Sequence, residues 1–194
     1  MIKQKEHPLS GRREMIKAPD GILYDVINQK HLQLSLAAGQ KGTVIAFICN
    51  HCPFVNHIIQ VVVNLAHYYA KEGINFIAIS SSDILQFPHD NPILMKTYAD
   101  ENAFPFPYLY DEHQKIARAF DVHCTPDFYV LDGGWHHYYR GQFDEARPAN
   151  TIAVTGADLS AALDMLIQGD VLNWKPVPSI GCIIRWKKND VSEI

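Results

Sequence analysis

FICNHCPFV, at residues 47–55, holds two cysteines at the junction of two different hydrophobic patterns. The run TVIAFI (43–48) is mostly β-branched or aromatic, which is typical of a strand buried on both faces of a sheet. From Pro53 onward the apolar residues recur at helical spacing until Gly73. A second buried-strand pattern follows at 74–80. Strand, helix and strand in this order predict a right-handed parallel βαβ unit.

The rest of the chain adds elements in an order that predicts an α/β fold, with a central mixed β-sheet flanked by helices. Alternation at 23–35 predicts an N-terminal β-hairpin. Asn91 and Pro92 have the residue types of a helix N-cap and a first helical position. The remaining elements are predicted as a helix at 92–102, a strand at 106–110, a helix at 111–120, a hairpin at 127–141 and a helix at 155–169.

Composition predicts the kind of protein. The chain has 194 residues, 47% apolar and 20% charged, which predicts a single domain over 1–194 with an N-terminal extension at 1–17 and an irregular C-terminal tail at 170–194. The net charge is −4 and no basic stripe occurs, so we expect no nucleic-acid partner. No apolar run approaches the roughly 20 residues of a membrane span. The basic N-terminus has no apolar segment behind it, so we expect a cytoplasmic location.

The cysteines indicate redox chemistry or metal binding. There are four, at Cys49, Cys52, Cys124 and Cys182, which are too few for a structural disulfide framework in a chain of this length. In a reducing compartment, a C-x-x-C spacing is typical of a catalytic dithiol or of half a metal site. Burial of the pair as two small hydrophobic residues is the third interpretation.

The redox interpretation assigns a role to each residue of the motif. Cys49 lies at the carboxyl end of a strand, where unpaired helix amides and the helix dipole are expected to lower its pKa. Cys52 follows in the first helical turn and is expected to be the more buried. We therefore expect Cys49 to attack and Cys52 to resolve. His51 lies between them and, as a cation, would stabilise the thiolate further; an exposed loop histidine is the alternative.

A second signal is HCTPDFYV, at 123–130. Pro126 cannot donate to a sheet ladder and is expected at the start of a strand. Spacing alone favours a trans bond before Pro126, whereas a cis Thr125–Pro126 bond would place a backbone edge beside the cysteines, ready to bind an extended substrate by strand addition. Cys124 is a candidate third redox partner, a metal ligand, or a buried small residue. Cys182, in the irregular tail, is either an additional resolving thiol or inert, and it stays unassigned.

AFICNHCPFV, HCTPDFYVLD, YRGQFD and PSIGCIIRWK together resemble the bacterial thioredoxin-like proteins of the redoxin (alkyl hydroperoxide reductase/thiol-specific antioxidant) superfamily. The resemblance extends from about Ala18 to Lys188. It implies a thioredoxin-like fold with an N-terminal hairpin and an inserted helix. It also implies a cis Pro126 that faces Cys49 and Cys52.

The sequence departs from the related families in two places. Thioredoxin has a buried aspartate in the strand before its cysteines, and the strand at 43–48 has no carboxylate. A water, His51 or another acid must then accept the proton of Cys52; Asp83 is the candidate acid, and a turn cap is its alternative role. Peroxiredoxins place a threonine three residues before the peroxidatic cysteine, where this chain has Ala46 before Cys49 and Cys49 before Cys52; this departure weakens the peroxidase interpretation.

The sequence therefore predicts a thiol–disulfide oxidoreductase that needs no metal or organic cofactor. Its expected partners are a protein or low-molecular-weight disulfide substrate and an unidentified reductase or thiol donor. Two alternatives stay open. One is a thiol peroxidase, and the other is a metal-binding module that uses Cys49, Cys52 and a histidine.

Overall fold

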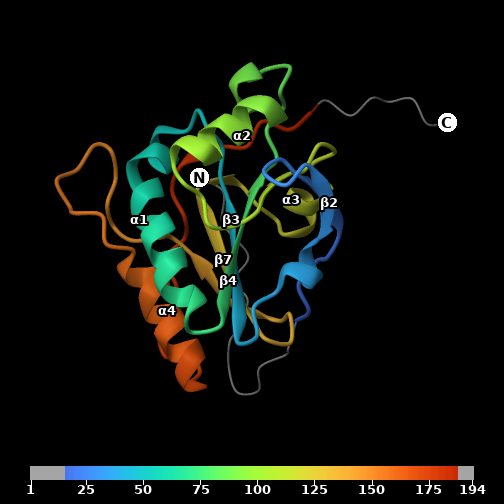
Figure 1. Cartoon of the computed structure of the whole chain (residues 1–194). Coiled ribbons are helices and arrows are strands. Elements are labelled where there is room, and N and C mark those ends of the chain that lie inside the picture. The colour runs from blue at the N-terminus through green and yellow to red at the C-terminus, as the bar shows by residue number, and fades with distance from the viewer. Residues whose placement is uncertain (1–15, 188–194) are drawn as a thin grey trace.

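The computed structural model describes residues 16–187 and contains a mixed sheet with helices on both faces (Figure 1). Strand β3 pairs in parallel with β4 and antiparallel with β7, so the predicted mixed sheet is confirmed. From edge to edge, the strands are β2 (Lys30–Gln33), β1 (Ile22–Asp25), β5 (Tyr108–Tyr110), β4 (Ile74–Ser80), β3 (Gly42–Phe47), β7 (Asp127–Asp132) and β8 (His137–Gly141).

The N-terminal hairpin is also confirmed, since β1 and β2 pair antiparallel at one edge of the sheet. The helices are α1 (Pro53–Ala70), α2 (Pro92–Glu101), α3 (Lys115–Ala119) and α4 (Ala157–Gln168), with short 3-10 helices η1 (Leu34–Ala37) and η2 (Pro88–Asp90). Figure 1 shows α1 and α4 on one side of the sheet and α3 on the other. The segment between β4 and α3 adds η2, α2 and β5, which corresponds to the expected inserted helix.

Strand β3 explains the continuous apolar run that precedes the cysteines. All six of its residues are buried. Val44 and Ala46 belong to the core cluster under α1 and α4, whereas Ile45 and Phe47 belong to the cluster under α3. Because successive side chains of a strand point to opposite faces, a strand covered on both sides is buried at every position and favours apolar residues throughout.

The start of α3 differs from the prediction. The helix begins at Lys115 instead of 111, and Gln114 precedes it in the left-handed conformation, at φ 55°, without a side-chain cap. The polar residues of this turn make tertiary contacts instead. The Asp111 carboxylate accepts hydrogen bonds from the Ser81 hydroxyl (2.9 Å) and from the Ala117 amide (2.9 Å).

The C-terminal tail contains strand pairing that the sequence did not predict. Residues 1–15 of the predicted extension and 188–194 of the predicted tail lie outside the described residues. Within the tail, β9 (Cys182–Ile183) pairs antiparallel with β6 (Cys124–Thr125), immediately before β7. In the part of the chain that the structure describes, no helix combines the length and apolar character needed to cross a membrane.

The N-cap of α2 allows a test of the fold. Asn91 Oδ1 accepts hydrogen bonds from the amides of Ile93 (2.9 Å) and Leu94 (3.1 Å), as predicted from its residue type. We expect Asn91→Ala to lower the free energy of unfolding by about 1 kcal/mol, because these amides lose their acceptor. Urea unfolding measures the difference. Asn91→Ser keeps a capping oxygen and is the matched control; equal losses in both variants would contradict the capping role.

Candidate active site

The two cysteines of the motif lie where β3 meets α1. Cys52 is the N-cap residue of α1, and Pro53 occupies the first helical turn, as the sequence predicted. Cys49 is 3% exposed and Cys52 is fully buried. A hydrogen bond joins the two thiols. The structure therefore brings the predicted pair together, with Cys52 the more buried of the two.

The acidity of the pair is the reverse of the sequence-based expectation. The pKa of the Cys52 thiol is lowered to about 5, because its sulfur accepts hydrogen bonds from the Cys49 thiol first and then from Cys182, Thr125 and the Val55 amide, against the opposing effect of burial. The expected helix amide thus reaches Cys52 instead of Cys49.

The pKa of Cys49 is raised. The causes are its hydrogen bond to Cys52, then burial, then the negative charge of Asp90. Because the two thiols are coupled through one hydrogen bond, their first ionisation belongs to the pair and leaves a single negative charge shared between two sulfurs.

His51 is held by an aspartate that the sequence analysis did not identify. His51 Nδ1 lies 2.5 Å from Asp90 Oδ2, and the other ring nitrogen, Nε2, lies 3.9 Å from Cys49 Sγ. Asp90 is fully buried and also accepts a hydrogen bond from the Asn50 amide (2.8 Å). The ring of His51 stacks on Phe87, with centroids 4.3 Å apart. The loop that contains η2 therefore fixes the middle of the C-x-x-C motif and aims the histidine at Cys49.

Thr125 reaches both cysteines, and the bond that follows it has the geometry that the resemblance implied. The Thr125–Pro126 peptide bond is cis, whereas spacing alone favoured trans. Thr125 Oγ1 lies 3.2 Å from Cys49 Sγ, and the Cys52 thiol, when protonated, donates to the Thr125 carbonyl oxygen (3.1 Å). One residue therefore contacts both sulfurs.

The expected free backbone edge beside the cysteines is already occupied. In the β6–β9 pair, Thr125 lies opposite Cys182 and Cys124 opposite Ile183. A Cβ on Gly181 would lie 2.0 Å from the Thr125 carbonyl oxygen, so the tail approaches this closely only because residue 181 is glycine. The prediction that a substrate adds here as a strand is therefore wrong for this arrangement of the tail.

Asp83 and Cys124 have contacts other than the expected ones. The Asp83 carboxylate accepts hydrogen bonds from the Leu85 amide (3.1 Å) and from Gln86 Nε2 (2.7 Å), which is the alternative turn-capping role. Cys124 Sγ contacts the Ser179 carbonyl oxygen at 3.6 Å, and burial is the main cause that raises its pKa to about 12. The acid that the structure places at the cysteines is Asp90.

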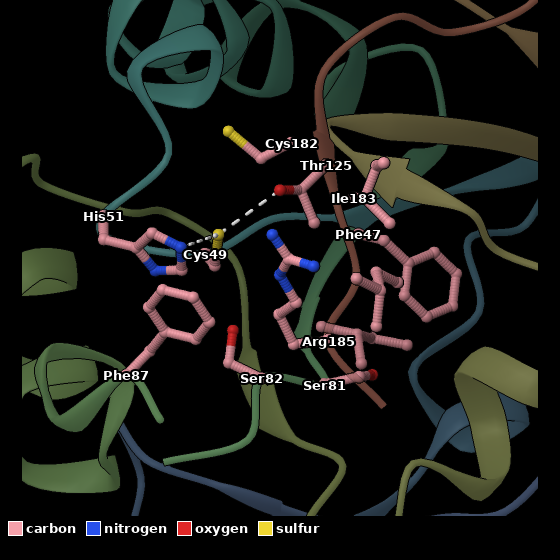
Figure 2. Close-up of a pocket in the computed structure, with 12 residues that line it drawn as sticks. Phe47, Cys49, His51, Ser81, Ser82, Phe87, Thr125, Cys182, Ile183 and Arg185 are labelled. Carbon is pink, nitrogen blue, oxygen red and sulfur yellow. Dashed lines mark hydrogen bonds between the residues drawn. The ribbon is translucent and has the colours of Figure 1, made fainter. Parts of the chain in front are cut away.

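A pocket opens over one of the two cysteines. Its lining includes Cys49, His51, Phe87, Thr125 and Cys182, and does not include Cys52. Figure 2 shows His51 and Thr125 on either side of Cys49, each joined to its sulfur by a dashed line. A molecule that enters the pocket therefore meets Cys49 before Cys52.

Cys49, His51 and Asp90 also satisfy a simple distance test for a metal site. One ligand atom from each lies within 4.8 Å of the others. The set combines a thiolate, an imidazole and a carboxylate, all of which zinc accepts as ligands. The short His51–Asp90 contact occupies two of these groups with each other.

Comparisons with known proteins identify the family and the fold of this chain. The model of the AhpC/TSA family matches residues 16–142. The crystal structure of an uncharacterized conserved protein from Geobacillus kaustophilus is 48% identical, with 88% of this chain and 90% of that chain covered and a TM-score of 0.86. A hypothetical protein from Sinorhizobium meliloti is 36% identical, with 92% and 97% covered and a TM-score of 0.86.

More distant structures identify the fold. A thiol:disulfide interchange protein of the thioredoxin family from Chlorobium tepidum is 16% identical, with 81% of this chain and 99% of that chain covered and a TM-score of 0.62. The fold is therefore thioredoxin-like, as the resemblance implied. The comparison with curated proteins returned no match.

The shared ionisation predicts a pH dependence. Because the pKa of Cys52 is about 5 against an ordinary value of 9.0, the reduced protein should lose its ultraviolet thiolate absorbance as the pH falls through about 5. Between these two values the unfolded chain binds the extra proton, so the stability of the reduced protein should rise with pH.

Two controls test the assignment. Cys49→Ala removes the main hydrogen-bond donor to Cys52 and should move the titration toward a higher pH. The oxidised protein has no thiolate on this pair and should lack the transition. A reduced protein that titrates only near the ordinary thiol pKa would contradict the shared ionisation.

Proposed function

The chain belongs to the AhpC/TSA family, and from this premise we propose that it is a thiol–disulfide oxidoreductase in which Cys49 attacks the substrate and Cys52 resolves. The observation that supports this most directly is the difference in access. Cys49 lines the pocket, whereas Cys52 is fully buried and is hydrogen-bonded to Cys49. A sulfur that can meet a substrate and a second one held within its reach are the two requirements of a dithiol mechanism.

The first step uses the hydrogen bond between the two sulfurs. Transfer of the shared proton from Cys49 to Cys52 places the negative charge on the sulfur that faces the pocket. Cys49 then attacks one sulfur of the substrate disulfide. A Cys49–substrate bond forms, the substrate S–S bond breaks, and the departing sulfur takes the electron pair together with the proton held by Cys52.

The second step closes the ring. The Cys52 thiolate attacks Cys49 Sγ, the Cys49–substrate bond breaks, and the second half of the substrate leaves as a thiolate. The chain now holds a Cys49–Cys52 disulfide, and two electrons have passed to the substrate. An external thiol donor must return the pair to the dithiol form.

His51, Asp90 and Thr125 position the attacking sulfur. The bond to Asp90 directs His51 Nε2 toward Cys49, where a protonated ring would stabilise the thiolate. The Thr125 hydroxyl, 3.2 Å from Cys49 Sγ, is a second donor to the same sulfur, and its hydrogen bond opposes the raised pKa of Cys49.

Activity measurements on two substrates test the proposal. Cys49→Ser should abolish reduction of both insulin and a small aromatic disulfide, a loss of about 1000-fold or more, because the covalent route is removed. Cys52→Ser should retain attack but accumulate the mixed disulfide on Cys49, visible by mass spectrometry. Cys124→Ser removes a thiol whose sulfur contacts the Ser179 carbonyl and is the matched control. A Cys49→Ser variant that works at the wild-type rate would show that the nucleophile is wrong.

Metal content separates this function from a metal-binding module. The proposal predicts that protein purified without oxygen has an intact thiol titre and no stoichiometric zinc or copper, because Asp90 already engages His51. Elemental analysis together with thiol counting measures both. One bound metal per chain that Asp90→Asn removes would favour the Cys49–His51–Asp90 site instead.

A further inference from the structure

Cys182 brings a third sulfur to the pair. Its Sγ lies 3.0 Å from Cys52 Sγ, although 130 residues separate the two in sequence. Directly opposite residues of an antiparallel pair have side chains on the same face, and Cys182 lies opposite Thr125, which contacts both motif cysteines. Cys52 therefore interacts with two other sulfurs, those of Cys49 and Cys182.

The approach of Cys182 is fixed by contacts on both sides of it. Before it, the Val177 carbonyl oxygen accepts a hydrogen bond from the Gln142 amide (2.9 Å). After it, the Ile184 amide donates to the His123 carbonyl oxygen (3.1 Å). The tail is thus fastened to the domain upstream and downstream of the sulfur, so the contact with Cys52 belongs to the fold.

We propose that Cys182 is a third redox-active thiol, which attacks the Cys49–Cys52 disulfide and forms a new disulfide with Cys52. The inference rests on the proposed function, which produces that disulfide. In the step, Cys182 attacks Cys52 Sγ, the Cys182–Cys52 bond forms and the Cys52–Cys49 bond breaks. Cys49 leaves with the electron pair and takes up the proton that Cys182 gives up. The exchange is redox-neutral and needs no further reagent.

Oxidation of the pair removes two of the causes that keep Cys182 protonated. In the reduced protein the pKa of Cys182 is raised to about 12, first by burial and then by its hydrogen bond to Cys52 and by the negative charge there. The last two causes end when Cys52 enters a disulfide. The two sulfurs, 3.0 Å apart, then need to approach by only about 1 Å to reach disulfide bonding distance.

The exchange gives each half of the catalytic cycle its own sulfur, Cys49 for attack on the substrate and Cys182 for reduction by the thiol donor. Cys49 becomes a free thiol again in the pocket, while the two oxidising equivalents reside on Cys52 and Cys182. Cys182 is partly exposed, whereas Cys52 is fully buried. An external dithiol reductant can therefore attack Cys182, so that substrate and reductant enter the same pocket and meet different sulfurs, Cys49 and Cys182.

Disulfide mapping in a Cys49→Ser variant tests the inference directly. With Cys49 absent as a competitor, one equivalent of diamide should join Cys52 to Cys182, and digestion followed by mass spectrometry should recover the two peptides as one species. Cys124 should stay open to alkylation, since its sulfur contacts the Ser179 carbonyl. If Cys52 and Cys182 both stay free after diamide treatment, the inference is overturned.

Gly181→Ala provides a second variant, which leaves both Cys52 and Cys182 in place. The new Cβ meets the Thr125 carbonyl and must shift the tail. Combined with Cys49→Ser, it should slow formation of the Cys52–Cys182 bond by about tenfold or more, because proximity is lost. Bond formation at the unchanged rate would overturn the role of the docked tail.

The two proposals fail in different ways. If wild-type protein forms Cys49–Cys52 but Cys49→Ser forms no Cys52–Cys182 bond, the inference falls and the proposed function stands. If Cys52–Cys182 forms but Cys49→Ser reduces insulin normally, the nucleophile assignment falls, and with it the entry of substrate at Cys49.

Discussion

The rest of the site depends on the contacts of one buried sulfur, that of Cys52 at the N-terminus of α1. It accepts hydrogen bonds from a thiol on either side and from a helix amide, and together these outweigh the cost of keeping a negative charge away from water. The charge is thus held inside the protein and shared with the sulfur that faces the pocket. The same arrangement makes the pair reactive and shields its thiolate from solvent, because the negative charge resides on the fully buried Cys52 sulfur.

Three segments far apart in sequence converge on this sulfur pair. The loop with η2 supplies Asp90 and so fixes His51, the turn before β7 supplies Thr125, and the C-terminal tail supplies Cys182. Thr125 and Cys182 reach the pair together, as opposite residues of the β6–β9 pair, while the buried strand β3 and the helix α1 hold the motif itself. The thioredoxin-like fold therefore holds the motif, and these three segments supply the side chains around it.

The sequence predicted the parts of this molecule that depend on local pattern. The buried run at 43–48, the helix after Pro53 and the Asn91 cap each follow from neighbouring residues. Asp90 could not be found in this way, because it has no motif and meets His51 across 39 residues. Cys182 lies in a tail without hydrophobic period, and its pairing with Thr125 depends on a close approach that only the folded chain makes visible.

The prediction that Cys49 has the lowered pKa was wrong for a related reason. A spacing argument gives the direction of the helix amides but does not say which of two neighbouring sulfurs accepts their hydrogen bonds. The tail that lies along Thr125 has one more consequence. Because this backbone edge is already paired, it cannot align the main chain of a substrate peptide by hydrogen bonding. The groups left to distinguish one substrate from another are the side chains that line the pocket, among them His51, Phe87 and Thr125.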